Sequence, residues 1–314
     1  MMGAPSDSSD TRRDLGPILW VRGEIEAALA RAVAVVRDEA GDDVQAAART
    51  ARAHLYQARG ALNMVGLDGS GRFIEVLEQL LADWADGRVA DKSAVGDLLE
   101  RSVAALSRVL DVVTQGGEEQ GLSLLPFYAQ VNALRGVDPP EPSELFFPDL
   151  SRVPALSVAR DDAQPDLARL RGRFQRGLLE WLRGRDGLAE MRAVVTDIGA
   201  MPGPAGARAF WWATTAFFDS LDGAGPAPDL ATKRLTARIE QQIRRLQAGS
   251  RTVAERLQRE LLCRVAVAER DGGAIDQVRQ AYGLHRLLPA ANIVESTPWE
   301  PILRRLREHL GAAK

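Results

Sequence analysis

The residue types that most often bind metals or act as acids and bases are few and scattered in this chain. The three histidines, His54, His285 and His309, lie far apart, and no His-Glu-x-x-His sequence or carboxylate–histidine pair accompanies them. Metal sites on helices need such ligands clustered at helical spacing. The sequence therefore predicts neither a metal site nor a cofactor.

The single cysteine and the glycine-rich pieces do not suggest a catalytic site either. Cys263 excludes an intramolecular disulfide, and it lies in an apolar helical run where a buried, inert thiol is expected. There is no Gly-x-Ser-x-Gly sequence, and the glycines at 69–71 and 272–273 join helices rather than following a strand. No catalytic residue is predicted, and we expect the protein not to be an enzyme.

One helical stretch does carry a patterned polar face. Apolar residues recur there at three- and four-residue spacing, at Val44, Ala48, Ala51, Leu55, Ala58, Leu62 and Val65. The opposite side then presents Arg52, Tyr56, Arg59, Gly60 and Asn63. A glycine in the middle of a helix costs about 1 kcal/mol relative to alanine, so Gly60 indicates the close approach of a partner. The alternative is that Gly60 allows tight packing against a helix of the same fold.

This stretch resembles the phosphorylated helix of histidine-phosphotransfer (HPt) domains. These domains carry an exposed histidine, two variable residues, a lysine or arginine that steadies the phosphoryl group, and a glycine. The segment Tyr56-Gln57-Ala58-Arg59-Gly60 matches the basic residue and the glycine but has tyrosine at the histidine position. His54 lies two positions earlier, about 200° around the helix, so it does not share the face of Arg59. The resemblance implies a receiver-docking face without phosphotransfer; the alternative is a phosphotransfer protein that uses His54.

The spacing of apolar and turn residues predicts an all-α protein. We expect helices at residues 17–40, 44–65, 70–85, 92–114, 122–134, 166–183, 188–201, 205–221, 229–247, 252–269, 274–282 and 296–310. The long helices and short turns of the first half favour a bundle of four or five helices. We therefore predict a disordered tail at 1–14, an HPt-like bundle at 15–135, a proline-rich linker at 136–165 and a second helical bundle at 166–314.

Two groups of aromatic residues add detail to these predicted domains. The linker contains Phe146 and Phe147, so it should be an extended segment docked on one or both domains. The helix at 205–221 carries Phe210, Trp211, Trp212, Phe217 and Phe218 around most of its circumference, which predicts a central position in the second bundle. The alternative for these aromatics is a ligand-binding box, and hence a helical enzyme with its site near Trp211 and Trp212.

Composition narrows the partners. The chain has 314 residues, a net charge of −3, 46% hydrophobic and 26% charged residues, so nothing draws it as a whole to nucleic acid or anionic membranes. There is no apolar run of about 18 residues and no signal-peptide core, and a cytoplasmic protein is expected. A basic region contains Lys233, Arg234, Arg238, Arg244, Arg245 and Arg251. It could bind phosphate or an acidic partner, but a solvated helix face is the preferred interpretation.

Three parts of the chain, in this order, resemble a known family. They are Leu19 to Ile25, then Tyr56 to Val65, and then a third part made of Leu145 to Ser151 and Phe174 to Leu179. They are similar to the N-terminal, degenerate HPt-like region of the ChpA/PilL-type chemotaxis histidine kinases of type IV pili, and to the related FimL scaffold proteins. The resemblance implies a scaffold in the pathway of twitching motility, with a PilG-like response-regulator receiver domain and the polar hub protein FimV as partners, and a place at the cell pole. A stand-alone FimL-like protein and a piece of a larger kinase both remain open.

Overall fold

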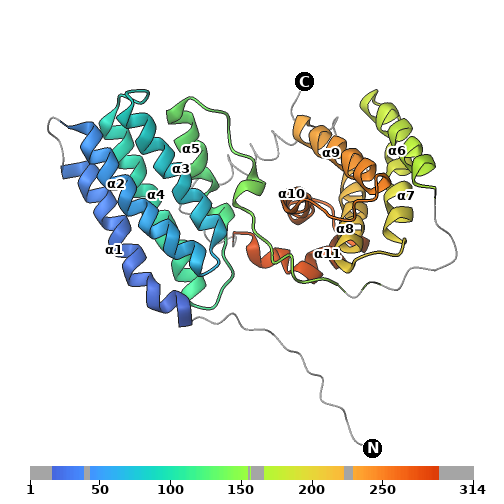
Figure 1. The fold of residues 1–314 in the computed structure, drawn as a ribbon, viewed down its shortest axis with the longest axis horizontal. Helices are drawn as coiled ribbons and strands as arrows, with labels where there is room; N and C mark the ends of the chain where they lie inside the picture. Colours follow the sequence, from blue (N-terminus) through green and yellow to red (C-terminus); the bar gives the residue numbers. More distant parts are fainter. Residues whose placement is uncertain (1–15, 39–42, 155, 157–165, 223–228, 290–314) are drawn as a thin grey trace, which may run out of the picture. The chain divides into compact units, whose positions relative to one another are not determined.

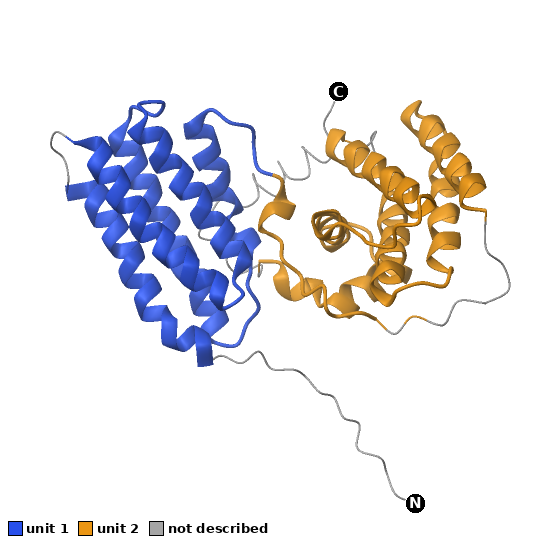
Figure 2. Cartoon of the chain, viewed as in Figure 1, with its two compact units in different colours: residues 1–140 blue, residues 141–314 orange. Residues whose placement is uncertain are grey.

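The computed structural model describes residues 16–38, 43–154, 156, 166–222 and 229–289. All regular elements in these ranges are helices, so the predicted all-α class is confirmed. The chain forms two compact units, residues 1–140 and residues 141–314 (Figure 2). The predicted tail at 1–14 and the predicted helix at 296–310 lie outside the described residues.

Unit 1 is a bundle of four long helices with a fifth beside it (Figure 1). The four are α1 (Gly16–Asp38), α2 (Val44–Met64), α3 (Asp68–Ala85) and α4 (Lys92–Thr114). Each packs against the next, and α4 packs back on α1, which closes the bundle. A 3-10 turn (Gly121–Leu124) leads into α5 (Leu125–Arg135), which lies against α3 and α4.

Local sequence explains where these helices begin and end. The side chain of Asp43 accepts a hydrogen bond from the Ala46 amide at the start of α2, and Asp91 does the same for Ala94 at the start of α4. Gly136 takes the left-handed conformation, with φ of 69°, that ends α5. Leu19, in the first turn of α1, is 56% exposed, because the neighbouring Ile18 takes the inward position there.

Unit 2 is built around α8. Its helices are α6 (Leu167–Leu182), α7 (Leu188–Gly199), α8 (Ala205–Leu221), α9 (Leu230–Gln247), α10 (Glu255–Ala266) and α11 (Gly273–Tyr282). α8 contacts α7, α10 and α11, whereas α6 packs between α7 and α9. The central position predicted for the aromatic helix is therefore correct: Phe210, Phe217 and Phe218 are fully buried.

The segment before α6 belongs to unit 2. A 3-10 turn, η2 (Pro142–Leu145), packs on α10, and Leu145 and Phe146 are buried. The guanidinium of Arg259 in α10 lies 4.2 Å from the centre of the Phe147 ring. η2 and Phe147 thus hold this segment against α10, while residues 157–165 of the same predicted linker lie outside the described residues.

Candidate functional site

The candidate site is the outward face of α2. This helix packs against α1 on one flank and α3 on the other. Leu55, Ala58 and Leu62 point into the core and are fully buried. The same helical geometry leaves the predicted receiver-docking residues on the other side: Arg52, Tyr56, Gly60 and Asn63 are exposed and Arg59 is half-buried.

Gly60 lies open on this face. A methyl group built on its Cα would have no atom within 4 Å apart from the helix's own backbone. The interpretation that Gly60 serves close packing between helices is therefore wrong for the described part of the chain. Tyr56, one turn earlier, is 65% exposed, so the position of the missing histidine is reachable from outside the bundle.

Arg59 is held by two neighbours. Its Nε lies 3.0 Å from Oε1 of Glu78 in α3, an ion pair without the alignment of a hydrogen bond. Its guanidinium carbon also lies 5.1 Å from the centre of the Tyr56 ring, within range of a cation–π contact. The charge at the position that steadies a phosphoryl group in HPt domains is thus already neutralised by a carboxylate of the same fold.

Glu78 is the residue of this site that sequence reasoning missed. Its side chain is only 12% exposed. Burial raises the pKa of its carboxyl, while Arg59 and, more weakly, Arg52 act in the opposite direction. The available signal was its place in α3 between the inward-pointing Leu77 and Leu80, which leaves little room for an exposed side chain.

Asn63 leans toward α3. The nearest atoms to a Cβ built on Gly71 would be those of the Asn63 side-chain amide, which would clash with it. A larger residue at Gly71 would therefore have to displace the Asn63 amide. Asn63 and Arg59 mark the α3 side of the docking face.

The histidines are not brought together. His54 is half-buried and, because it lies two positions from Tyr56, it is on the opposite flank of α2 from Arg59. His285 lies exposed in a 3-10 turn (Leu284–Leu287) of unit 2, and His309 is outside the described residues. Among the described residues, no three histidine, cysteine, aspartate or glutamate side chains are grouped closely enough to hold a metal ion.

The aromatic cluster of unit 2 is filled core, which counts against an aromatic ligand box. The Phe210 and Trp211 rings lie 4.9 Å apart between centres, and Phe174 of α6 contacts Phe218 edge-on at 6.0 Å. Trp211 is buried and Trp212 is partly exposed.

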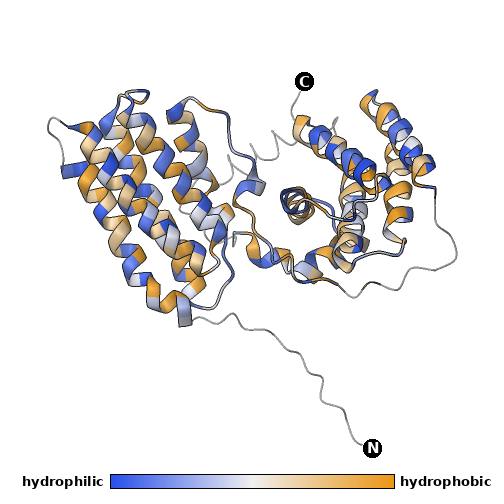
Figure 3. Cartoon of the chain, in the orientation of Figure 1, coloured by the Kyte–Doolittle hydropathy of each residue, from blue (hydrophilic) through white to orange (hydrophobic). Residues whose placement is uncertain are grey.

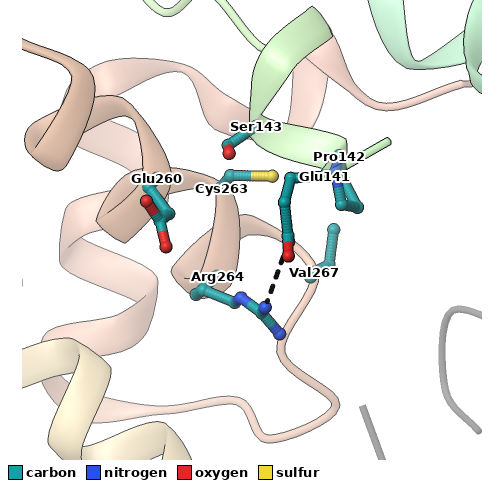
Figure 4. A pocket seen from close by; sticks show the side chains of 7 residues that line it. All are labelled: Glu141, Pro142, Ser143, Glu260, Cys263, Arg264 and Val267. Atoms are coloured by element: carbon teal, nitrogen blue, oxygen red, sulfur yellow. Dashed lines mark ion pairs between the residues drawn. The ribbon is translucent and has the colours of Figure 1, made fainter. Parts of the chain in front are cut away.

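A small cavity lies elsewhere in unit 2, between η2 and α10 (Figure 4). Its lining includes Glu141, Cys263 and Arg264, and it has room for about one water molecule. Burial raises the pKa of Cys263 to about 12, so this thiol is protonated at neutral pH. The cavity is too small for a substrate, and the prediction that Cys263 is buried is confirmed.

Comparison with known proteins concerns the second unit. Residues 159–295 match the family model described as FimL scaffold protein second domain. This stretch contains α6 to α11, and α2 lies outside it. The match supports the FimL part of the predicted resemblance over residues 159–295, whereas the kinase part and the resemblance of the first unit remain predictions.

No curated protein and no solved structure matches the chain. No helix among the described residues is long and apolar enough to cross a lipid bilayer.

Proposed function

We propose that this chain is a non-catalytic scaffold of a type IV pilus chemosensory pathway that governs twitching motility. In this role it binds the receiver domain of a response regulator of the PilG type through Arg52, Tyr56, Arg59, Gly60 and Asn63 of α2. The polar hub protein FimV is the second partner that the family resemblance implies, with a cytoplasmic location at the cell pole. The similarity of residues 159–295 to a scaffold protein supports this class of function.

The observation that carries the docking face is the open glycine. Gly60 lies in the middle of a 21-residue helix, where glycine weakens the helix, and no described part of the fold uses the space above it. Beside it stand an exposed tyrosine and a half-buried arginine. An exposed aromatic side chain next to a flat, open backbone suits a docking site, because a partner can bury Tyr56 while approaching the helix closely.

The chemistry of the face supports recognition without phosphotransfer. Tyr56 has no imidazole nitrogen, and a phenol with an ordinary pKa of about 10 is a poor phosphoryl acceptor at neutral pH. Arg59, which would steady a phosphoryl group, is paired with Glu78. The face thus lacks a good phosphoryl acceptor and a free cation beside it, the two groups that phosphotransfer requires. It keeps an exposed surface that a partner can contact.

The test is receiver binding by a Gly60→Arg variant. An arginine at this position fills the open space and should reduce affinity for a PilG-like receiver domain by at least about 100-fold in calorimetry, because hot-spot contacts at interface centres have this weight. Gly23→Arg is the matched control, since Gly23 is an exposed helical glycine of α1 whose Cβ position is equally open. Equal affinities for both variants would show that the face is misassigned.

Incubation with a ³²P-phosphorylated receiver separates the scaffold from the phosphotransfer alternative. The scaffold predicts no label on the chain. Acid-labile label that disappears in a His54→Ala variant would establish His54 as an acceptor and would refute the scaffold function as proposed here.

A further inference from the structure

Helices α6 and α9 carry more positive charge than their surroundings neutralise. Together they contain nine arginine or lysine residues and two glutamates. Some of these cations have partners: Arg171 pairs with Glu240, Arg173 with Glu190, and Arg238 with Glu260. Within the described residues, no ion pair engages the remaining cations, which are Arg169, Arg176, Lys233, Arg234, Arg244 and Arg245.

Helix stability explains only part of this charge. Arg244 and Arg245 lie in the last turn of α9, where cations interact favourably with the helix dipole. Lys233 and Arg234 lie near the beginning of the same helix, where the dipole disfavours them. The stability of α9 therefore does not explain why Lys233 and Arg234 are at these positions.

The two helices run antiparallel, and this places the second pair beside the end of α6. The Gln175 amide donates to Glu240 at 2.8 Å, and Arg171, one turn earlier in α6, reaches Gln247, two turns later in α9, at 3.3 Å. Leu182 follows Gln175 by about 10 Å of helix, and Lys233 precedes Glu240 by the same length. The end of α6 and the beginning of α9 therefore lie at the same end of the helix pair (Figure 1).

Three exposed leucines lie at this end. Leu179 and Leu182 of α6 are 53% and 47% exposed, and Leu230 of α9 is 55% exposed. They are not needed for the core, because Phe174 and Leu235 already fill the inward faces of the two helices. Apolar and charged residues alternate along both helices (Figure 3). Leu179, Leu182, Leu230, Lys233 and Arg234 are hereafter the α6–α9 patch.

Nearby acids do not cancel the charge of this patch. Glu180 is shared by Arg183 at 3.3 Å and Arg185 at 3.0 Å, so one carboxylate faces two guanidinium groups. Asp229 is buried, caps α9 and lies 3.6 Å from Arg264. Asp186, in the turn after α6, is the remaining described acid of the turn at 183–187.

We propose that the α6–α9 patch binds an acidic amphipathic helix of a partner protein. Two antiparallel helices form a groove between them into which a third helix can pack. The leucines would contact the apolar face of that helix, and Lys233 and Arg234 would pair with its acidic residues. This surface lies on the second unit and is independent of the receiver-docking face on α2.

A protein helix fits the patch better than the two other anionic ligands. Single-stranded nucleic acid needs exposed aromatic rings for base stacking, and the patch has none. Binding in a membrane interface needs one continuous apolar helix face, whereas Leu170 and Phe174, and likewise Leu235 and Ile239, turn such faces into the core.

The probe is a synthetic peptide of about 20 residues, long enough to form a helix, with leucines on one face and glutamates on the other. A peptide with lysine in place of every glutamate is its control. The fluorescence anisotropy of each labelled peptide is titrated with the full chain at low salt. The acidic peptide should bind at least about tenfold more tightly than the basic one, because the patch is positive and weakly screened.

Paired variants locate the binding site. Lys233→Gln with Arg234→Gln should weaken acidic-peptide binding at least about tenfold. Arg244→Gln with Arg245→Gln removes the same charge at the other end of α9. At about 0.1 M salt this pair should weaken binding less than about threefold, because the two residues then lie more than a Debye length from the leucines. Leu179→Ser with Leu182→Ser should weaken binding by a similar factor to the first pair, with unchanged thermal unfolding since both side chains are exposed.

Three results would overturn the proposal. The first is equal affinity for the acidic and basic peptides, or no binding of either, with the unaltered chain. The second is an equal loss of binding in the 233/234 pair and in the 244/245 pair of glutamine variants. The third is binding of phosphatidylglycerol vesicles or of a single-stranded oligonucleotide, sensitive to Lys233→Gln and Arg234→Gln, in place of peptide binding.

Discussion

The α2 face and the α6–α9 patch both combine cations with exposed apolar or aromatic side chains, but they differ in how the fold treats the charge. On α2, Arg59 is neutralised by Glu78 of the neighbouring helix and covered by Tyr56. On α9, Lys233 and Arg234 have no ion-pair partner among the described residues. Among the described residues, Arg52 is the one cation of the first surface without an ion pair, so this surface carries less net charge than the second, where two such cations lie beside the leucines.

The two units differ in net charge in the same way as the two surfaces: the second unit is the more positive. Residues 1–140 contain 14 basic and 21 acidic residues, whereas residues 141–314 contain 26 basic and 22 acidic residues. A receiver would therefore dock on an acidic unit, while the proposed helix would dock on a basic one. Two surfaces of opposite character let one chain hold two unlike partners without competition, which is what a scaffold requires.

The largest expected effect concerns the neutralised arginine. A Tyr56→His variant restores the acceptor but leaves Arg59 paired with Glu78. We expect it to take little phosphoryl group from a phosphorylated receiver, and the double variant Tyr56→His with Glu78→Gln to take at least about tenfold more, since a freed cation can stabilise the incoming charge. Acid-labile ³²P label measures both. Equal labelling of the two variants would show that Glu78 does not control Arg59.

Salt concentration should have a smaller effect, and it should change the affinity of one surface more than that of the other. Exposed charge pairs are screened over about 8–10 Å at physiological ionic strength. Between about 50 and 300 mM salt, acidic-peptide binding to the α6–α9 patch should weaken about tenfold, and receiver binding to the α2 face less than about threefold. Titrations of both ligands on one protein preparation make the comparison. A steeper loss for the receiver would contradict the weaker net charge of the α2 face.

Much of this architecture could be predicted, because its signals are local. The bounds of α4 and α8 agree with prediction since Asp91 caps one helix and proline and glycine precede the other. α10 (Glu255–Ala266) is shorter than the predicted 252–269 at both ends; at its C-terminal end, Arg279 of α11 donates hydrogen bonds to the carbonyls of Val265 and Ala268. That contact joins residues distant in sequence, so periodicity does not reveal it.

The candidate site was likewise predictable only where local sequence determines it. The stripe of Leu55, Ala58 and Leu62 was sufficient to place Tyr56 and Gly60 on an outward face. The pairing of Arg59 with Glu78 depends on how α2 packs on α3, and that register is a tertiary property. The exposed leucines of α6 were equally hidden, since their spacing resembles that of core residues.

Protein stability should also distinguish the two kinds of cation. Arg59→Gln leaves the Glu78 carboxylate nearly buried without its closest counter-charge, which should cost about 1–2 kcal/mol of unfolding free energy at neutral pH. Arg234→Gln removes an exposed charge and should change stability by less than about 0.5 kcal/mol. Urea unfolding of the two variants provides the values. A similar small change in both would mean that Arg59 does not compensate Glu78.

The smallest expected effect is a pH dependence that isolates Glu78 itself. Burial raises the pKa of its carboxyl in the folded state, so folding favours the protonated form. The resulting stabilisation is fully present below the unfolded pKa of about 4.3 and is lost as pH rises through the folded value.

The Glu78→Gln variant does not lose stability in this way. The melting temperature of Glu78→Gln minus that of the parent should therefore increase by a few degrees between about pH 4 and pH 7. Glu24→Gln, at an exposed position of α1, controls for the loss of one charge. A difference that stays constant or falls with pH would mean that Arg59 and Arg52 outweigh burial, and the α2 face would then hold a fully compensated ion pair.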